Sequence, residues 1–195
     1  MHGLINRAME RFLRETYGSG AWQQIAAHAD LPFDSFEPLM TYDPTLTTAM
    51  VKAAAVVLDR PTDALMEDMG TYLVSHRSGE RLRRLLRFGG VGFRDFLHSL
   101  EELPARARLA LPDLVLPDMR LVELGGKEFT LAMTAPFPGA GFVLMGLLRA
   151  MADDYGSLVF LDITGHGTMG DTILIQLLDE DFAEGRRFDL AAGIA

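Results

Sequence analysis

The chain of 195 residues contains no cysteine. This absence excludes disulfide bonds, thiolate-bound haem, cysteine zinc sites and iron–sulfur clusters. The sequence also lacks an apolar run of the ~18 residues that a membrane-spanning helix requires, because the longest candidate, 141–151, contains Arg149. Near the N-terminus, Arg7, Glu10 and Arg11 interrupt any stretch that could act as a signal peptide. We therefore expect neither a signal peptide nor a membrane span, and a cytoplasmic location.

Positive charge is scarce as well. The formal net charge is −9, whereas nucleic-acid-binding domains are normally basic, so we expect no nucleic-acid partner. One segment departs from this balance, since leucines are interleaved there with five arginines: Arg77, Arg81, Arg83, Arg84 and Arg87. The pattern predicts an amphipathic helix with a basic outer face. Arg77, Arg81, Arg84 and Arg87 would then be either solvated or a docking surface for an acidic partner.

The common catalytic motifs are missing too. The sequence has no Gly-x-Ser-x-Gly elbow, Walker A loop, GxGxxG or HExxH motif. Asp162, His166 and Asp171 bracket a glycine-rich segment and could form a metal cluster. A hairpin turn requires such glycines and polar neighbours in any case. We therefore expect no catalytic residues and no metal site.

What is present is a compactly folding chain, 49% hydrophobic, that reads as helical in its first two-thirds. Apolar periodicity and capping residues predict helices at 4–17, 22–29, 46–58, 63–76 and 79–86, and another from residue 93. After residue 117 the pattern predicts strands at 119–124 and 128–135, a helix at 141–153, and a hairpin of 158–164 with 172–178.

This order predicts an α+β fold, in which helices pack on an antiparallel sheet of about four strands. We expect one domain over 1–183, with a helical N-terminal subdomain at 1–60 and an α+β subdomain at 61–183. The remaining residues, 184–195, are predicted to form a loosely held tail.

The segment 93–104 carries one buried stripe at helical spacing, formed by Phe93, Phe96, Leu97, Leu100 and Leu103. At roughly 100° per residue, position 104 returns to within about 20° of Phe93 and faces the core. His98 lies about 140° away, on the polar side. Pro104 offers no donor atom to the core, and proline is expected to end or kink the helix near Leu103. Taken alone, Pro104 is interpreted as a helix terminator.

Four features of the sequence together resemble one family. They are the opening Met1-His2-Gly3-Leu4-Ile5-Asn6, the pair Tyr17-Gly18, Trp22, and the pattern Phe96-Leu97-x-x-Leu100-x-x-Leu103. Each is weak alone, but their order and spacing resemble the H-NOX family, the haem nitric oxide/oxygen binding domains. The resemblance covers residues 1–183 and implies the α+β fold predicted above.

The resemblance also implies haem held by two devices. One is an axial histidine, whose place in the family pattern falls on Pro104. The other is a Tyr-x-Ser-x-Arg strand that grips the haem propionates, and its three positions fall on Met133, Ala135 and Phe137. All four replacements are apolar, so this sequence departs from the family at every position that would bind haem.

The second departure has a physical consequence. On a strand, residues 129, 131, 133, 135 and 137 would share one face, and all five are apolar here. Ionised propionates against such a face would lose hydration without gaining partners, at a cost of at least several kcal/mol. We therefore expect no cofactor in this chain.

We interpret the chain as a haem-free, H-NOX-like regulatory or interaction domain in bacterial signalling. Its former haem pocket would be packed shut or hold an apolar small molecule or lipid, lined by Leu4, Ile5, Phe96, Leu100, Pro104, Met133, Ala135 and Phe137. The resemblance implies a signalling partner such as a histidine kinase or a cyclic-di-GMP enzyme. The alternative is a haem-binding nitric-oxide sensor with His2, His98 or no protein side chain as axial ligand.

Overall fold

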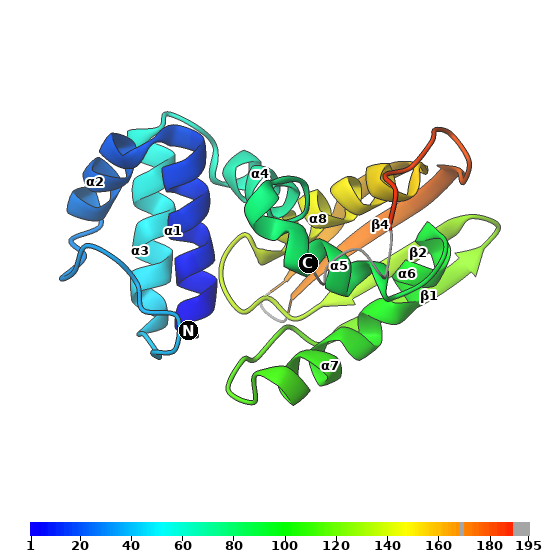
Figure 1. The fold of residues 1–195 in the computed structure, drawn as a ribbon, viewed down its shortest axis with the longest axis horizontal. Coiled ribbons are helices and arrows are strands. Elements are labelled where there is room, and N and C mark those ends of the chain that lie inside the picture. Colours follow the sequence, from blue (N-terminus) through cyan, green and yellow to red (C-terminus); the bar gives the residue numbers. More distant parts are fainter. Residues whose placement is uncertain (168–169, 189–195) are drawn as a thin grey trace, which may run out of the picture.

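The computed structural model describes residues 1–167 and 170–188 (Figure 1). Its N-terminal part is helical, as predicted, and consists of α1 (Gly3–Tyr17), α2 (Ser19–His28) and α3 (Pro44–Val57). The start of α3 follows from its first residues, because the Asp43 carboxylate accepts a hydrogen bond from the Thr45 N–H at 2.8 Å. Proline at the first helical position needs no N–H donor there.

The middle of the chain is also helical. They are α4 (Thr62–Ser75), the 3₁₀ turn η1 (Arg77–Gly79), α5 (Glu80–Arg87), α6 (Phe93–Ser99), the 3₁₀ turn η2 (Leu100–Glu102) and α7 (Leu103–Ala110). Among the described residues no helix has both the length and the apolar character needed to cross a bilayer.

The C-terminal part builds the sheet. Its elements are β1 (Met119–Gly125), β2 (Glu128–Met133), α8 (Ala140–Tyr155), β3 (Leu158–Gly167) and β4 (Gly170–Asp179). The four strands pair antiparallel in the order β1-β2-β4-β3. This arrangement confirms the predicted α+β fold with a four-stranded antiparallel sheet.

Two hydrophobic cores hold these elements together. The first lies among α1, α2, α3 and the first half of α4, and the second lies between the sheet and helices α6 and α8. Helix α4 belongs to both, since Met69 packs in the first core and Val74 in the second. It also lies very close to α8: a Cβ added at Gly70 would lie 2.0 Å from the Val143 carbonyl oxygen. Only glycine permits this approach.

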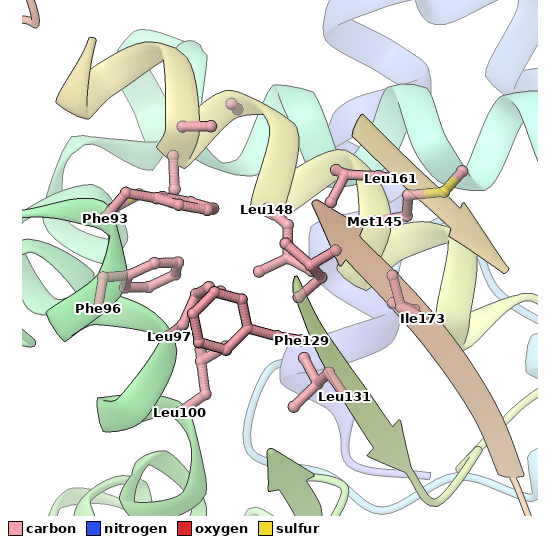
Figure 2. Close-up of a cluster of buried hydrophobic side chains, with 14 of the residues drawn as sticks. Phe93, Phe96, Leu97, Leu100, Phe129, Leu131, Met145, Leu148, Leu161 and Ile173 are labelled. Carbon is pink, nitrogen blue, oxygen red and sulfur yellow. The ribbon is translucent and has the colours of Figure 1, made fainter. Parts of the chain in front are cut away.

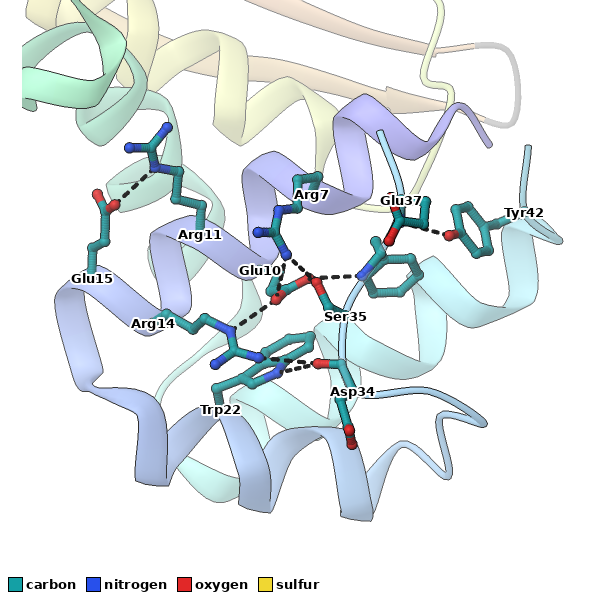
Figure 3. A network of polar contacts seen from close by, with 11 residues as sticks. Arg7, Glu10, Arg11, Arg14, Glu15, Trp22, Asp34, Ser35, Glu37 and Tyr42 are labelled. Carbon is teal, nitrogen blue, oxygen red and sulfur yellow. Dashed lines mark hydrogen bonds and ion pairs between the residues drawn. The ribbon is translucent and has the colours of Figure 1, made fainter. Parts of the chain in front are cut away.

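A buried carboxylate, that of Glu10 in α1, forms a hydrogen-bond network beside the N-terminal core (Figure 3). Its oxygens accept hydrogen bonds from Arg7 at 2.9 Å, from Arg14 at 2.8 Å and from the Phe36 N–H at 2.9 Å. A buried charge is tolerated when it is paired and hydrogen-bonded in this way. The network therefore fixes the loop around Phe36 to α1.

The end of the described chain differs from the expected loose tail. The Arg186 N–H donates to the Asp154 carbonyl at 2.9 Å, and the Arg187 carbonyl accepts from the Arg83 guanidinium at 3.2 Å. The Phe188 ring meets Phe88 edge-on. Residues 184–188 are thus held against the end of α8, and the rest of the predicted tail lies outside the described residues.

Candidate functional site

Pro104 is buried at the start of α7, and the helix before it is interrupted. Helix α6 ends at Ser99, and the Leu100 carbonyl accepts from the Leu103 N–H, which is a 3₁₀ bond. A regular α-helix would use the N–H of residue 104 instead, which proline lacks. The predicted kink is therefore present, three residues earlier than expected, and a new helix follows it.

The inner face of α6 packs directly on the sheet (Figure 2). Phe96 and Leu100 are buried, as their helical spacing predicts. They share the second core with Phe129 and Leu131 of β2 and with Leu148 of α8. Two of the predicted pocket residues are therefore core residues of the sheet subdomain.

His98 lies on the opposite side of α6 and is exposed, again as predicted. Its Nε2 atom lies 3.8 Å from the Glu123 carboxylate. Its ring meets Phe129 edge-on, with the ring centres 6.1 Å apart. The histidine of this segment therefore lies beside the edge strand β1, near Glu123.

The strand that would carry the propionate clamp is shorter than predicted. Strand β2 ends at Met133, and the Thr134 N–H still bonds the Asp118 carbonyl at 3.1 Å. Pro136 and Pro138 follow, and proline has no N–H to continue a ladder. The expectation that residues 129–137 alternate on one strand face is therefore wrong beyond Met133.

Met133, Ala135 and Phe137 consequently lie in different surroundings. Met133 is buried at the end of β2, Ala135 is exposed in the loop, and Phe137 is half-buried against the N-terminal core. Phe137 lines a cavity of about 180 Å³ with Val51 and Thr62. The loop thus carries a former clamp position away from the sheet and across to the helical subdomain.

The two predicted residues of α1 also separate from the others. Leu4 lines a cavity of about 160 Å³ together with Arg11, Tyr72 and Ser78. Ile5 packs against the N-terminal core. A third cavity, of about 380 Å³, lies where β1 and β4 begin and β2 ends, and Met133 lines it.

The eight predicted pocket residues are therefore not gathered around one cavity. Leu4, Phe137 and Met133 each line a different one. Cavities that bury a drug-sized ligand usually measure roughly 300–1,000 Å³. Of these three cavities, that at Met133 reaches the lower end of this range, and a porphyrin is larger than a typical drug. A cavity of about 530 Å³ beside Trp22 is larger, but none of the eight predicted residues lines it.

The groups around the cavity at Met133 fit haem poorly. Its ionisable lining consists of two carboxylates, Asp118 and Asp171, and one guanidinium, Arg120. Asp171 is buried and accepts a hydrogen bond from the Gly141 N–H at 3.1 Å, at the positive end of α8. Propionates placed there would meet charges of their own sign. Among the side chains that the structure describes, no histidine lines the cavity.

A polar cluster that sequence reasoning missed joins the ends of α1 and α4. Tyr72 and Arg11 donate hydrogen bonds to the Glu15 carboxylate, and they lower the pKa of Glu15 to about 2. Ser78 Oγ lies 2.8 Å from His76 Nδ1, and a Glu15 oxygen lies 3.1 Å from the same nitrogen. A catalytic triad uses both ring nitrogens, one for the nucleophile and one for the carboxylate. Because Ser78 and Glu15 share one nitrogen of His76, this cluster is not arranged as a triad, and it connects α1 to the end of α4.

The basic segment also differs from its prediction. Arg83 of α5 is buried and forms an ion pair with the buried Asp154 of α8 at 2.6 Å. Arg87 lies over the Tyr155 ring at 3.9 Å and is half-buried. The predicted basic outer face is thus wrong for Arg83 and Arg87, because the buried Asp154 requires cations on the inner side. Arg81 is exposed, as predicted.

The described residues contain no group of three or more histidine, aspartate or glutamate side chains that could hold a metal ion. Asp162 is exposed, and Asp171 caps α8. The side chain of His166 lies outside the described part of the structure, so the cluster considered from the sequence falls partly outside the described residues.

The comparisons with known proteins agree with each other. The sequence model of the haem-NO-binding family (HNOB) matches residues 2–162. Soluble guanylate cyclase 89Da of Drosophila melanogaster is 22% identical over 158 residues, covering 81% of this chain and 24% of the cyclase. Soluble guanylate cyclase gcy-31 of Caenorhabditis elegans is 26% identical over 154 residues, covering 79% of this chain and 22% of the cyclase. The chain thus spans about a quarter of the length of these relatives.

Solved structures show the same fold. The unliganded Fe(II) H-NOX protein from K. algicida superposes with a TM-score of 0.78 at 15% identity, covering 94% of this chain and 100% of that one. The Fe(II)NO form of an H-NOX protein from S. oneidensis gives a TM-score of 0.75 at 17% identity, covering 92% and 100%. At such identities the likeness establishes the fold.

Proposed function

Because the chain belongs to the haem-NO-binding (HNOB, H-NOX) family of sensor domains, we propose that it is a haem-free regulatory or interaction domain in bacterial signalling. One observation carries the proposal: Pro104, at the family's axial-ligand position, is buried and holds no donor atom. The former haem pocket is packed shut, or holds only an apolar ligand smaller than haem.

The iron would find no axial ligand from this segment. Pro104 is fixed by the 3₁₀ turn before it and by its own burial. His98 could replace it only if α6 rotated by more than a third of a turn, which would expose Phe93 and Phe96 to water. Burying such large apolar side chains contributes roughly 1.5–3 kcal/mol each. The alternative of a haem sensor with His98 as ligand is therefore disfavoured.

His2 is the other histidine considered as a ligand. Its Nδ1 atom accepts a hydrogen bond from the Leu4 N–H at 3.1 Å and so caps the N-terminus of α1. Its backbone forms a β-bridge with Thr41. His2 therefore has a structural role that accounts for its position, and using it for iron would require the start of α1 to rearrange.

The propionates would find no clamp either. The family pattern places Tyr, Ser and Arg where this chain has Met133, Ala135 and Phe137, and the loop carries these positions apart. A bidentate arginine and a hydroxyl are the groups that compensate a partly buried carboxylate. Two carboxylates, Asp118 and Asp171, outnumber the one guanidinium, Arg120, around this cavity, and this balance favours neutral or apolar molecules over dianions.

The role of the domain is then carried by its surfaces. In its cyclase relative 89Da the matching segment is 24% of a longer chain, and we propose a signalling enzyme as partner here. A separately encoded histidine kinase or cyclic-di-GMP enzyme is the expected kind, in the cytoplasm, and the domain itself performs no catalysis. Co-purification of tagged domain with that enzyme tests the partner; the enzyme eluting separately at all concentrations would contradict it.

Native mass spectrometry tests the proposed pocket. The chain is produced in cells supplied with a haem precursor, so that haem supply does not limit loading. We expect the mass of the polypeptide alone, or of the polypeptide with a small apolar adduct that organic solvent extracts. A stoichiometric haem adduct would contradict the proposal. If an apolar adduct is found, Met133→Glu should abolish it, while Gln24→Glu, at an exposed position on α2, serves as the surface control.

A further inference from the structure

The sheet has two edge strands, β1 and β3, and they are protected to different degrees. At the edge of β1, the Glu101 carboxylate of η2 accepts a hydrogen bond from the Leu121 N–H at 2.7 Å, and η2 packs along the strand. Strand β3 packs against β4 and α8, and no other helix or strand of the described chain packs extensively against it. The outer side of β3 is therefore open, and the free N–H and C=O groups of an open edge can pair with another strand.

The hydrogen-bond register shows which groups face this open edge. The Leu177 N–H of β4 donates to the Lys127 carbonyl, beside β2, at 2.8 Å. Backbone groups point to alternate sides along a strand, so the odd-numbered residues of this part of β4 bond β2 and the even-numbered ones bond β3. Gln176 of β4 lies opposite Phe160 of β3. The even-numbered residues of β3 in this stretch therefore bond β4, and the odd-numbered ones direct their backbone groups outward.

Three residues of β3 consequently present their backbone groups at the open edge: Val159, Leu161 and Ile163. Within the described chain, none of their N–H or C=O groups has a backbone partner on that side. Their side chains lie on the inward face, where Leu161 belongs to the second core (Figure 2). The edge is thus unpaired in its backbone, while the side chains that anchor the strand remain in the core.

The segment 159–163 lacks most of the devices that keep edge strands apart. Its sequence, Val-Phe-Leu-Asp-Ile, has no proline, glycine or lysine, and Asp162 carries the single charge. Side chains that are β-branched or aromatic favour strands. Register shifts beside Leu158 and before Gly165 limit the regular stretch to this segment. The segment is therefore suited to pair with one further strand.

We propose that the segment 159–163 pairs antiparallel with the same segment of a second copy, across a two-fold axis that passes beside Leu161. Leu161 then lies opposite the partner's Leu161, and Val159 lies opposite the partner's Ile163. All of these residues have their backbone groups at the open edge, so each pair can form two hydrogen bonds, about six in all. The sheets of the two copies become one continuous sheet.

The side chains of the segment favour this register and a second copy as the occupant. With the axis at Leu161, Phe160 lies opposite the partner's Asp162, so no like charges face each other. An axis at Asp162 would place two carboxylates opposite each other, and an axis at Phe160 would lose one of the hydrogen-bonded pairs. The segment is thus complementary to itself, which an interface with two-fold symmetry requires.

The short paired length sets the expected strength. A standard interface uses roughly 20–30 residues from each partner. The edge contact uses only the segment 159–163 and its immediate neighbours. The dimer should therefore be weak, with a dissociation constant on the order of 100 µM.

Sedimentation velocity of the full chain, from about 5 to about 500 µM, tests the association. Amide hydrogen exchange, followed by NMR over the same range, locates it. At the highest concentration the N–H groups of Val159, Leu161 and Ile163 should exchange about threefold more slowly, because most of the chain is then dimeric. The N–H groups of Phe160 and Asp162 bond β4, so they should be protected at the lowest concentration already.

Charge variants at Phe160, whose side chain is 49% exposed on the outward face, test the register. Phe160→Asp places a carboxylate opposite the partner's Asp162, whereas Phe160→Lys places the opposite charge there, and symmetry repeats each pair. Both variants remove the same aromatic side chain, so their comparison isolates the charge. The dissociation constant of Phe160→Asp should exceed that of Phe160→Lys at least about fivefold.

Val122→Asp and Val122→Lys, at an exposed position on the other edge strand, are the matched controls. Their dissociation constants should agree within about twofold, because distant exposed charges are largely screened. Far-UV circular dichroism and the thermal midpoint confirm that each variant is folded. The proposal is overturned if the unmodified chain stays monomeric up to about 500 µM. It is also overturned if a dimer forms without slower exchange at Leu161, or if the two Phe160 variants associate equally.

Discussion

At the scale of single residues, Pro104 accounts for both a structural and a chemical feature. Proline lacks the N–H from which the Leu100 carbonyl would otherwise accept a hydrogen bond, so a 3₁₀ turn separates α6 from α7. It also places a saturated ring where the family pattern has an imidazole. Under the proposed function, the same residue thus interrupts the helix and leaves the iron without its usual ligand.

Pro104→His tests whether the site is still shaped for a ligand. In a packed site the imidazole is buried without a partner, which costs about 1–3 kcal/mol. We expect the free energy of unfolding in urea to fall by that amount, with no gain of haem binding. Pro104→Ala is the matched control, because it restores the N–H for Leu100 without adding a buried polar group. A His variant as stable as the Ala variant, with a haem spectrum, would show that the pocket is intact.

The ion pair of Arg83 with Asp154 is the second test at this scale. The Arg83 side chain is 5% exposed and that of Asp154 is 1% exposed. Removing one member of a buried pair usually costs 3–5 kcal/mol, because the other charge is left unpaired. Arg83→Met should therefore lower the free energy of unfolding by about 3 kcal/mol. Arg87 and Arg186 also lie within 4 Å of Asp154, at 3.7 and 3.8 Å, and reduce the loss.

Arg81→Met is the control for this measurement. Arg81 lies on the same helix and is exposed. Its replacement should change stability by less than about 0.5 kcal/mol, as is usual for surface substitutions. Equal effects of the two variants would mean that the pair with Asp154 is not formed in solution.

At the scale of elements, the contact between α1 and α4 depends on Glu15. Its pKa is lowered from 4.5 to about 2 because Tyr72 and Arg11 donate hydrogen bonds to the ionised carboxylate. A carboxylate with a depressed pKa in the folded state adds stability above its unfolded pKa and loses it as the pH falls toward the folded value. The stabilisation from Glu15 should therefore be complete above about pH 4.5 and lost between there and about pH 2.

The measurement compares the unfolding free energy of the unmodified chain and of Glu15→Gln as a function of pH. The difference between them should be constant near neutral pH and shrink as the pH falls below 4.5. Glu102→Gln, at an exposed position on η2, is the control for the loss of one surface carboxylate. A difference that persists unchanged down to about pH 2 would contradict the assigned hydrogen bonds.

At the scale of the whole molecule, local patterns predicted the fold well. Helix starts followed from caps such as Asp43, the inward stripe of α6 followed from its spacing, and the antiparallel sheet followed from alternation and turn glycines. Tertiary contacts decided what these patterns leave open. The burial of Arg83 depends on an aspartate 71 residues away, and no local periodicity indicates such a pair.

The site was less predictable for the same reason. Helical spacing correctly predicts that Phe96 and Leu100 are buried. Strand periodicity alone predicts that β2 continues past Met133, but Pro136 and Pro138 lack the N–H groups that would continue the ladder. Phe137 consequently lies against the helical core and not beside Met133. Residue spacing does not specify how the two subdomains are joined, so it could not predict that Leu4, Met133 and Phe137 line three different cavities.

The central claim is that this member of the haem-NO-binding family does not bind haem, and an absorption spectrum tests it most directly. The purified chain is measured before and after addition of one equivalent of haemin, then after reduction and exposure to nitric oxide. We expect the broad spectrum of free haemin, unchanged by the protein. A sharp Soret band that shifts on reduction and on nitric oxide addition would contradict it.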